Sequence, residues 1–463
     1  MELKKYKLGE ILDVTRGASL SGEFYAAKGE YVRLTCGNFD YQNNCFKENK
    51  AKDNLYYIGD FKPDFLMKEG DIITPLTEQA IGLLGSTAII PESGKYIQSQ
   101  DVAKIVCKEH LLDKDFAFYL ISSNLVKQQL SAAAQQTKIR HTSPDKIKDC
   151  IVWIPELEEQ KRIGKLLRTI DLKIELNRQL NHNLEAMAKQ LYDYWFVQFD
   201  FPDENGKPYK SSGGKMVWDK RLKREIPLLW KAKMVEEVAD VYNGATPSTV
   251  NELNYGGDIV WITPKDLSDQ KQKFVYQGER NISQVGYDSC STHLLPSNTI
   301  LMSSRAPIGL LAIAKTELCT NQGFKSFVSK SKNIATYLYY YLQYHITQIE
   351  QLGTGTTFKE VSREDILKFP MLKPSDNVLD LWEEIVSALN DRQLEIQKEN
   401  ENLIKQRDEL LPLLMNGQVS VNYDLAETGF ILFCISIATK ICFQLIKSII
   451  VNSVLIIAFY INP

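Results

Sequence analysis

Two long segments of this chain carry apolar residues at helical spacing. In the first, apolar side chains recur in steps of mostly three or four residues, at Ile163, Leu166, Ile170, Ile174, Leu180, Leu184, Met187 and Leu191. In the second they fall at Trp382, Ile385, Leu389, Ile396, Leu403, Leu410 and Leu414. This spacing predicts two long amphipathic helices, over residues 155–196 and 375–416. Each has one apolar face and needs a partner, so we expect the two to pack as an antiparallel coiled coil.

The segments that precede these helices follow a different pattern. Between residues 1 and 154, short β-rich runs alternate with glycine turns, most clearly at 31–34, 71–74, 87–90 and 102–106, and a helix is predicted from about 115 to 134. Residues 226–374 form a second unit of this kind. The sequence therefore predicts an α+β protein with two mixed α/β domains, each followed by a long helix.

Two further segments and two single residues complete this organisation. Residues 197–225 are turn-rich and polar and are predicted to be a linker, whereas residues 417–463 form a largely apolar tail. Gly417 is expected to end the second helix. Asn177 falls near the apolar face of the first helix, where a polar residue can fix the register of paired helices.

The two halves of the chain resemble each other. Leu8–Gly17 returns as Val235–Gly244, at an offset of 227 residues (244 − 17). Thr137–Ser143 returns more loosely as Thr356–Ser362, at an offset of 219 (362 − 143). The repeated unit is a whole domain with its helix, which is far longer than a solenoid repeat. A protein built from two like halves is expected to act on a target that also comes in two like halves.

Composition excludes several classes of protein. The chain has 463 residues, 24% of them charged, and a net charge of −3, which argues against a polybasic binder but not against local basic patches. Its eight cysteines form no C-x-x-C pair, so no structural zinc site is expected. The N-terminus has no apolar signal-peptide core, and we expect a cytoplasmic protein with free thiols.

The tail from Gly429 onward allows two interpretations. Its two apolar runs, 429–439 and 449–461, are each shorter than the ~18 to 20 residues that a membrane-spanning helix needs. The alternative, which we favour over a membrane anchor, is an appended segment that the fold does not require. Deleting residues 429–463 is then expected to leave solubility and binding intact.

Catalytic motifs are absent from the sequence or occur in the wrong context. There is no G-x-x-x-x-G-K-[ST] phosphate loop, no G-x-S-x-G elbow and no H-E-x-x-H metal motif. Asp145 followed by Glu159 and Lys161 resembles an acidic nuclease pattern, but Glu159 and Lys161 fall in the first turn of a predicted helix. We therefore expect no catalytic residue and no metal site in this chain.

Cations beside polar turns are the candidate binding residues. They are Arg33, Lys104, Lys138 and Arg140 in the first domain, and Lys265, Arg280, Arg305, Lys325 and Lys359 in the second, with Asn321 and Gln322 nearby in sequence. Such side chains can contact phosphates or base edges of DNA, although a single cation is more often a solvated surface residue. The repeat aligns the turn at 304–309 with 78–82, so that Arg305 is replaced by a neutral or acidic residue in the first domain.

Several segments resemble one family. Residues 191–196 (Leu-Tyr-Asp-Tyr-Trp-Phe) and 199–214, beginning Phe-Asp-Phe-Pro-Asp-Glu-Asn-Gly-Lys-Pro, are its most specific features, together with Thr320–Lys325 and the start of the first long helix at 155–163. On these residues the chain resembles the specificity subunit of a type I restriction-modification enzyme. The resemblance covers roughly residues 1–425, and the tail beyond Glu427 has no counterpart in it.

The resemblance implies a function and a set of partners. The two α/β domains would be target recognition domains that each read half of a split double-stranded DNA site, and the two helices would be a spacer. Two methyltransferase subunits would dock on the chain, and restriction or motor subunits would join them. The chain would be non-catalytic and would bind no cofactor, whereas S-adenosylmethionine, ATP and Mg²⁺ would bind in the partner subunits.

Three rival interpretations remain open from the sequence. The first is a coiled-coil scaffold that binds proteins and has no DNA specificity. The second is a stand-alone nuclease that uses Asp145, Glu159 and Lys161. The third is a membrane-tethered form that uses residues 429–461.

Overall fold

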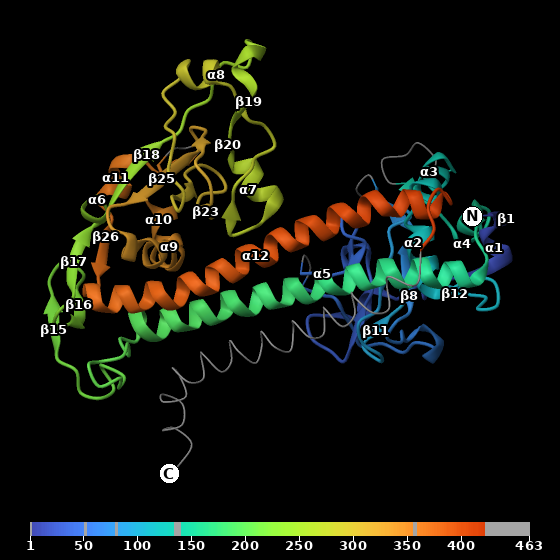
Figure 1. Ribbon diagram of the computed structural model, residues 1–463. Coiled ribbons are helices and arrows are strands. Elements are labelled where there is room, and N and C mark those ends of the chain that lie inside the picture. Colours follow the sequence, from blue (N-terminus) through green and yellow to red (C-terminus); the bar gives the residue numbers. More distant parts are fainter. Residues whose placement is uncertain (1, 51–52, 79–81, 134–139, 355–358, 422–463) are drawn as a thin grey trace. The chain divides into compact units, whose positions relative to one another are not determined.

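The computed structural model describes residues 2–50, 53–78, 82–133, 140–354 and 359–421 (Figure 1). It contains two compact units. Unit 1 holds the described residues up to Leu176 and those from Asn400 onward, and unit 2 holds Asn177–Glu399. The division falls inside both long helices, α5 (Leu157–Tyr192) and α12 (Asp376–Met415), so each helix contributes to both units.

The first domain is built from short strands and helices that belong to unit 1. Its helical elements are α1 (Leu8–Ile11), η1 (Gly22–Phe24), η2 (Cys36–Asn38), η3 (Pro63–Phe65), α2 (Lys114–Ile121), α3 (Asn124–Ala133) and α4 (Pro144–Lys148). Its strands are β1 (Lys4–Lys7), β2 (Leu12–Arg16), β3 (Tyr25–Ala26), β4 (Tyr31–Arg33), β5 (Phe39–Asp40), β6 (Cys45–Phe46), β7 (Tyr56–Tyr57), β8 (Ile72–Pro75), β9 (Thr77–Glu78), β10 (Ala88–Ile89), β11 (Tyr96–Ile97), β12 (Val102–Cys107), β13 (Arg140–His141) and β14 (Ile151–Ile154).

The second domain, in unit 2, has the same kind of composition. Its helical elements are η4 (Asp193–Val197), α6 (Val235–Val238), η5 (Glu252–Asn254), α7 (Pro264–Gln270), α8 (Gln284–Asp288), η6 (Lys332–Ile334), α9 (Ala335–Tyr344), α10 (Ile346–Gln351) and α11 (Arg363–Leu367). Its strands are β15 (Met216–Asp219), β16 (Arg224–Pro227), β17 (Lys231–Met234), β18 (Ala239–Asn243), β19 (Tyr255–Ile259), β20 (Trp261–Ile262), β21 (Phe274–Val275), β22 (Ile300–Ser303), β23 (Leu311–Ala314), β24 (Cys319–Thr320), β25 (Phe324–Ser329) and β26 (Pro370–Lys373).

The first domain has a further four-stranded sheet of order β11-β4-β7-β3, and both domains have an equivalent central sheet. In unit 1 the strand order is β10-β8-β12-β2, and in unit 2 it is β18-β25-β22-β23-β21. The middle strand β22 is almost entirely apolar because both of its faces are buried: all four of its residues are buried. Figure 1 shows α9 between the sheet of unit 2 and the amino-terminal part of α12. The mixed α/β prediction for both domains is confirmed.

The structure confirms the repeat at the level of strand register. Lys4 pairs with Ile154 between β1 and β14, and Lys231 pairs with Lys373 between β17 and β26. The two pairs differ by 227 (231 − 4) and 219 (373 − 154) residues, which are the offsets found in the sequence.

Glycine occupies one equivalent position in both domains for the same reason. A Cβ atom on Gly17 would lie 2.3 Å from the carbonyl oxygen of Gln98, and one on Gly244 would lie 2.2 Å from that of Asn321. Both distances are far shorter than a van der Waals contact, so only glycine allows the strand to pass this close to a neighbouring backbone.

The two long helices pack antiparallel within each unit. In unit 1, Ile163 and Leu167 of α5 share a core with Leu414 and Met415 of α12, whereas the later Ile170 and Ile174 pack on the earlier Leu403. In unit 2, the Asn177 amide donates to the Glu399 carboxylate (2.7 Å), and the amide of Gln393 donates to the backbone oxygen of Asn181 (3.2 Å). The predicted helix pair is therefore confirmed, with Asn177 buried in the contact.

One residue was wrongly assigned to the buried face of the first long helix. Met187 is 41% exposed, whereas Ala188 is fully buried. After Leu184 the buried face advances by four residues to Ala188 and again to Tyr192, which is also buried. The sequence pattern pointed to Met187 because a large apolar residue outweighed the small alanine beside it.

The start of the expected linker at 197–225 is packed into the core of unit 2. Phe199 and Phe201 are buried, and their rings lie 5.5 Å and 4.8 Å from that of Trp230. The Asp200 carboxylate accepts hydrogen bonds from the backbone N–H and the hydroxyl of Ser211 (2.7 and 2.6 Å). Phe199 and Phe201 are thus part of the core of unit 2, whereas the turns at 204–207 and 210–213 are exposed, and the β15–β16 hairpin follows.

One predicted helix is broken in two, and another ends where expected. The helix expected from about 115 to 134 is split into α2 and α3, because the hydroxyls of Ser122 and Ser123 bond to backbone oxygens of α2 and end it. Gly417 has a φ of +70° and ends α12 as expected.

Within the described residues, no helix is both long and apolar enough to cross a membrane. The tail at 429–463 lies outside the described residues.

Candidate nucleic-acid interface

Arg305 and Lys325 share one carboxylate in the second domain. Arg305 follows β22, and its Nε–H donates to Oε2 of Glu360 (3.0 Å). The Lys325 ammonium, on β25, lies 3.3 Å from Oε1 of the same residue and 3.4 Å from the hydroxyl of Ser304. The Lys325 side chain is only 5% exposed, whereas that of Arg305 is 48% exposed. Arg305 is thus available to a ligand at the surface, whereas Lys325 is buried and contacts the carboxylate that Arg305 also contacts.

The other predicted residues of this domain lie around the same strand ends. The backbone N–H of Ser304 donates to the oxygen of Gly323 (2.7 Å), which ties the Arg305 strand to the loop with Asn321 and Gln322. The Asn321 side chain accepts from the N–H of Gly323 (2.9 Å), and that of Gln322 accepts from the Thr246 hydroxyl. Asn321 therefore shapes the loop, and Gln322 is exposed on it.

Lys359 and Lys265 are exposed cations of the second domain. Lys359 precedes Glu360 in the sequence and is exposed. Lys265 is the second residue of α7, and its ammonium pairs with the carboxylate of Glu279 (2.8 Å) while both side chains remain largely exposed. Such a pair is easily exchanged for a phosphate contact, because an exposed ion pair contributes little to stability.

Three of the predicted cations contact a partner side chain within their own domain. The Arg33 guanidinium, which is buried, stacks on the Tyr25 ring (3.9 Å), and the Arg280 guanidinium stacks on Tyr255 (3.6 Å). The Lys104 ammonium pairs with Asp71 (2.7 Å), and both side chains are mostly buried. We assign Arg33 and Lys104 structural roles on this geometry.

The remaining predicted residues of the first domain are Lys138 and Arg140. Lys138 lies outside the described residues. The backbone of Arg140 pairs with that of Glu78 between β13 and β9. The next pair in this ladder joins His141 to Thr77.

The ladder corrects the alignment of Arg305 with the first domain. The N–H of Thr142 donates to the oxygen of Leu76 (2.9 Å), and the N–H of Val361 donates to that of Ser304 (3.0 Å). Leu76 is therefore the counterpart of Ser304, and Thr77 that of Arg305. The sequence alignment was anchored on the following glycine and placed Glu78 and Gln79 there. It was wrong because the turn up to that glycine is one residue longer in the first domain.

The residues that sequence reasoning missed are the partners across this bridge. His141 lies opposite Thr77 in the first domain, and Glu360 lies opposite Arg305 in the second. Glu360 was missed because acidic residues were not considered as candidate DNA contacts. The loose repeat of Thr137–Ser143 as Thr356–Ser362 contained both residues and was the signal that could have found them.

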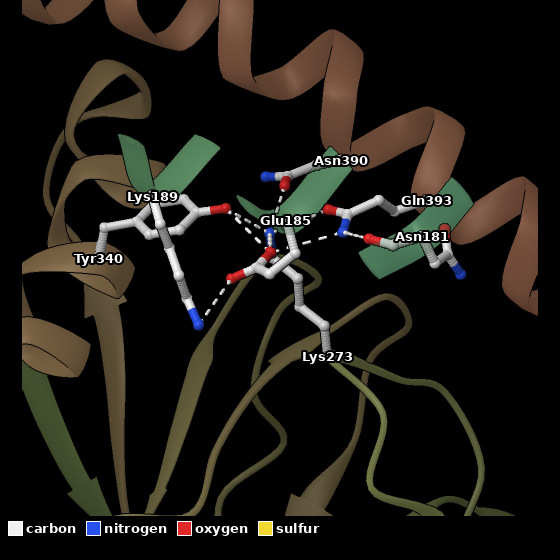
Figure 2. A network of polar contacts seen from close by, with 7 residues as sticks. All are labelled: Asn181, Glu185, Lys189, Lys273, Tyr340, Asn390 and Gln393. Atoms are coloured by element: carbon white, nitrogen blue, oxygen red, sulfur yellow. Dashed lines mark hydrogen bonds and ion pairs between the residues drawn. The ribbon is translucent and has the colours of Figure 1, made fainter. Parts of the chain in front are cut away.

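A second polar cluster joins the domain of unit 2 to both long helices (Figure 2). The Lys273 ammonium, next to β21, donates to Glu185 of α5 (2.8 Å), Tyr340 of α9 (2.6 Å), and Asn390 and Gln393 of α12 (2.7 and 3.1 Å). Burial lowers the pKa of Lys273 to about 8, although Glu185 opposes the shift. Burial alone would raise the pKa of Glu185, but Lys273 outweighs it and that pKa is lowered.

Unit 1 has a smaller cluster where its domain meets the helices. The Tyr119 hydroxyl of α2 donates to Oδ2 of Asp171 on α5 (2.5 Å), and Arg407 of α12 donates to Oδ1 of Asp171 (2.9 Å). The Arg407 and Asp171 side chains are 10% and 18% exposed. Both clusters join a domain to its helices and so position the surfaces described above.

The carboxylates of the nuclease interpretation form ion pairs with neighbours in their own helices. The Asp145 carboxylate pairs with Lys148 (2.9 Å) inside α4, and Glu159 pairs with Arg162 (3.3 Å) in the first turn of α5. Among the described residues, no group of three or more His, Cys, Asp or Glu side chains could hold a metal ion. The geometry therefore gives no support to a nuclease centre.

Sequence comparison places this duplicated architecture in a family. The family model described as "Type I restriction modification DNA specificity domain" matches residues 1–186 and 227–406, which is most of the chain. The chain belongs to this family. The two matched segments each contain one α/β domain and a large part of the long helix that follows it.

Relatives within the specificity family match different shares of the chain. The type I restriction enzyme MjaIX specificity subunit of Methanocaldococcus jannaschii is 35% identical over 197 residues, which are 41% of this chain and 46% of that relative. The HindI specificity subunit of Haemophilus influenzae is 24% identical over 467 residues, covering 90% of this chain and 99% of the relative. The chain thus spans less than half of the first relative and nearly all of the second.

A solved structure shows the same fold. The S subunit of the type I restriction-modification system from M. genitalium aligns with a TM-score of 0.58 and covers 90% of this chain and 96% of its own. The two sequences are 15% identical. At this identity the likeness supports the fold of the specificity family and says nothing about individual side chains.

Proposed function

We propose that this chain is the specificity subunit of a type I restriction-modification enzyme, in which each α/β domain recognises one half of a split DNA site. One observation carries the proposal beyond family membership. The two domains share a backbone frame to the level of single hydrogen bonds, yet the same bridge holds Thr77 and His141 in one and Arg305 and Glu360 in the other. A conserved frame with exchanged side chains suits two readers of different base sequences.

The binding would have a sequence-independent part and a sequence-reading part. Exposed lysines such as Lys265 and Lys359 would contact backbone phosphates, which adds affinity that falls as salt rises. A few side chains at the strand ends, foremost Arg305, would reach base edges in a groove and select the sequence. Each domain would do this separately, so the recognised site would be split.

The long helices would set the spacing and carry the partners. Two methyltransferase subunits would dock on the chain, and restriction or motor subunits would join them. Methylation of adenine requires the base to leave the helical stack, and this step, with S-adenosylmethionine, belongs to the partners. ATP and Mg²⁺ would likewise act in partner subunits, and this chain would supply recognition without catalysis.

The test is adenine methylome sequencing of cells that carry this gene with its methyltransferase gene. We expect one methylated motif made of two short defined halves separated by unspecified bases. The control is the same strain without this gene, in which that motif is expected to be unmethylated. A continuous motif, or a split motif that persists in the control, would refute the proposal. Absence of salt-dependent duplex binding by the purified chain would favour the protein-binding scaffold instead.

A further inference from the structure

We infer that Arg305 is the side chain with which the second domain reads a guanine, that Glu360 positions it, and that Thr77 and His141 occupy the corresponding reading position of the first domain. The inference rests on the proposed function and adds the residues that distinguish the two half-sites. It is carried by the equivalence of the two bridges, by the exposure of Arg305 and by the charge arrangement around Glu360.

The two positions share one backbone pairing and differ in their side chains, although Glu360 also pairs with Thr354 in the second domain. Thr77 lies opposite His141 in the β9–β13 ladder, and Arg305 lies opposite Glu360 in an antiparallel bridge. The side chains meet across both bridges. The Thr77 hydroxyl lies 3.4 Å from Nδ1 of His141, and the Arg305 Nε lies 3.0 Å from Glu360. The frame therefore holds one pair of polar side chains at the same place in each domain, with His141 exposed above the buried Thr77 in the first and Arg305 exposed in the second.

The contact with Glu360 leaves Arg305 oriented for recognition. Because Nε–H is the donor to Glu360, this contact does not use the outer edge of the guanidinium, where one N–H of each terminal amino group can take a new acceptor. A guanidinium fork in this state matches O6 and N7 of guanine in the major groove. Holding the side chain before binding reduces the rotamer entropy lost when it contacts a base.

Lys325 explains why a carboxylate can stand at a surface that binds DNA. Its buried ammonium lies 3.3 Å from Oε1 of Glu360, so the carboxylate sits between two cations and the group of three has a net positive charge. In the first domain the strand position of Lys325 is taken by Ala103, since Ala103 pairs with Arg16 as Lys325 pairs with Asn243. The charged triad belongs to the second domain alone.

The difference in charge predicts different bases. The second domain offers a cationic fork, which discriminates strongly for guanine. The first domain offers the exposed imidazole of His141, which suits a single hydrogen bond to a base edge, whereas Thr77 is buried and contacts this ring from within the domain. The two half-sites are therefore expected to differ at the base pair that these positions meet.

The test compares adenine methylomes of cells carrying the full chain, its methyltransferase partner and single variants. For Arg305→Ala we expect preference at one guanine of one half-site to fall by about 10-fold or more, with the other half-site unchanged. Arg305→Lys is expected to lose most of the same preference, because lysine lacks the fork. Glu360→Gln is expected to weaken preference at the same base to a smaller extent, and Glu360→Ala to a larger one. His141→Ala is expected to relax the other half-site.

Three results would overturn the inference. One is an unchanged motif for both Arg305 variants with normal methylation. Another is that the Arg305 and His141 variants affect the same half-site. The third is that Glu360→Ala lowers overall methylation without changing preference at the base that Arg305 affects, since a merely structural role would do this. If Arg305→Ala does not fold, Arg305→Lys decides the question. Failure of the proposed function is distinct, because the wild-type chain would then produce no split motif.

Discussion

In unit 1 the cation that joins the domain to the helices is Arg407, a helix residue, whereas in unit 2 it is Lys273, a residue of the domain itself. Both clusters contain a tyrosine of the domain, Tyr119 or Tyr340, and a carboxylate of α5. The repeat therefore preserves a buried polar cluster between domain and helices, but different residues supply its cation. Removing Lys273 should weaken the contact between the domain of unit 2 and its helices. Removing Arg407 should weaken the contact between α5 and α12 in unit 1.

The largest effect is expected for Lys273→Met. Glu185 would stay mostly buried and keep only the more distant ammonium of Lys189 (3.8 Å), and breaking a buried pair in this way costs up to about 3–5 kcal/mol of unfolding free energy. The expected result is a lower melting temperature for the transition of unit 2 in calorimetry of the full chain. Lys315→Met is the control, since Lys315 is also partly buried in unit 2 but its ammonium donates to the exposed Asn298.

The double variant Lys273→Met with Glu185→Leu sharpens this prediction. It removes both charges, so it is expected to cost less than Lys273→Met alone, because apolar replacement of a whole buried pair is often nearly neutral. A double variant as unstable as the sum of the two single variants would contradict the coupling of Lys273 to Glu185.

A smaller effect is expected for Arg407→Met in unit 1. Asp171 keeps the hydrogen bond from Tyr119, so the loss is its contact with Arg407, worth about 2 kcal/mol, together with the pair between Arg407 and the exposed Asp408, which contributes little. Calorimetry should show the transition of unit 1 moving while that of unit 2 stays in place. Arg407→Lys keeps the charge and is expected to lose less. Destabilisation of unit 2 alone would contradict the assignment of the two clusters.

The next prediction concerns pH. The pKa of Lys273 is lowered by burial to about 8, so between about pH 8 and its ordinary value of 10.5 the unfolded chain binds more protons than the folded chain. The unfolding free energy of unit 2 should therefore rise with pH across this window, relative to Lys273→Met, by at most about 1.4 kcal/mol per pH unit. Chemical denaturation at several pH values measures it, and a stability difference that falls with pH would contradict the shift.

The smallest effect on stability is expected at the surface. Lys265→Ala breaks only the exposed pair with Glu279, so the melting temperature should not change measurably. If Lys265 contacts a phosphate, the slope of log affinity against log salt should become shallower by about 0.9. Glu279→Gln is the matched control, which removes the pair but keeps the cation. An unchanged slope for Lys265→Ala would remove this residue from the interface.

The long helices and the repeat could be predicted because both depend on patterns that are local in sequence. Side-chain size misled the prediction at Met187, since the helix buries Ala188 instead. The packing of Phe199 and Phe201 was missed because polar turn residues beside them hide a core segment. Burial of a cation is not visible in a sequence, so Lys325 and Arg305 looked alike. The Arg305–Glu360 contact joins residues 55 positions apart and required the strand register.

The most direct measurement is the methylome of cells carrying a chain with seven residues inserted in both α5 and α12, one heptad in each so that the helix pairing is kept. If the domains read separate half-sites and the helices set their spacing, both halves should stay the same and the gap should lengthen by about three base pairs, because a heptad adds about 10 Å. An unchanged gap with full methylation, or a changed half-site, would contradict this account.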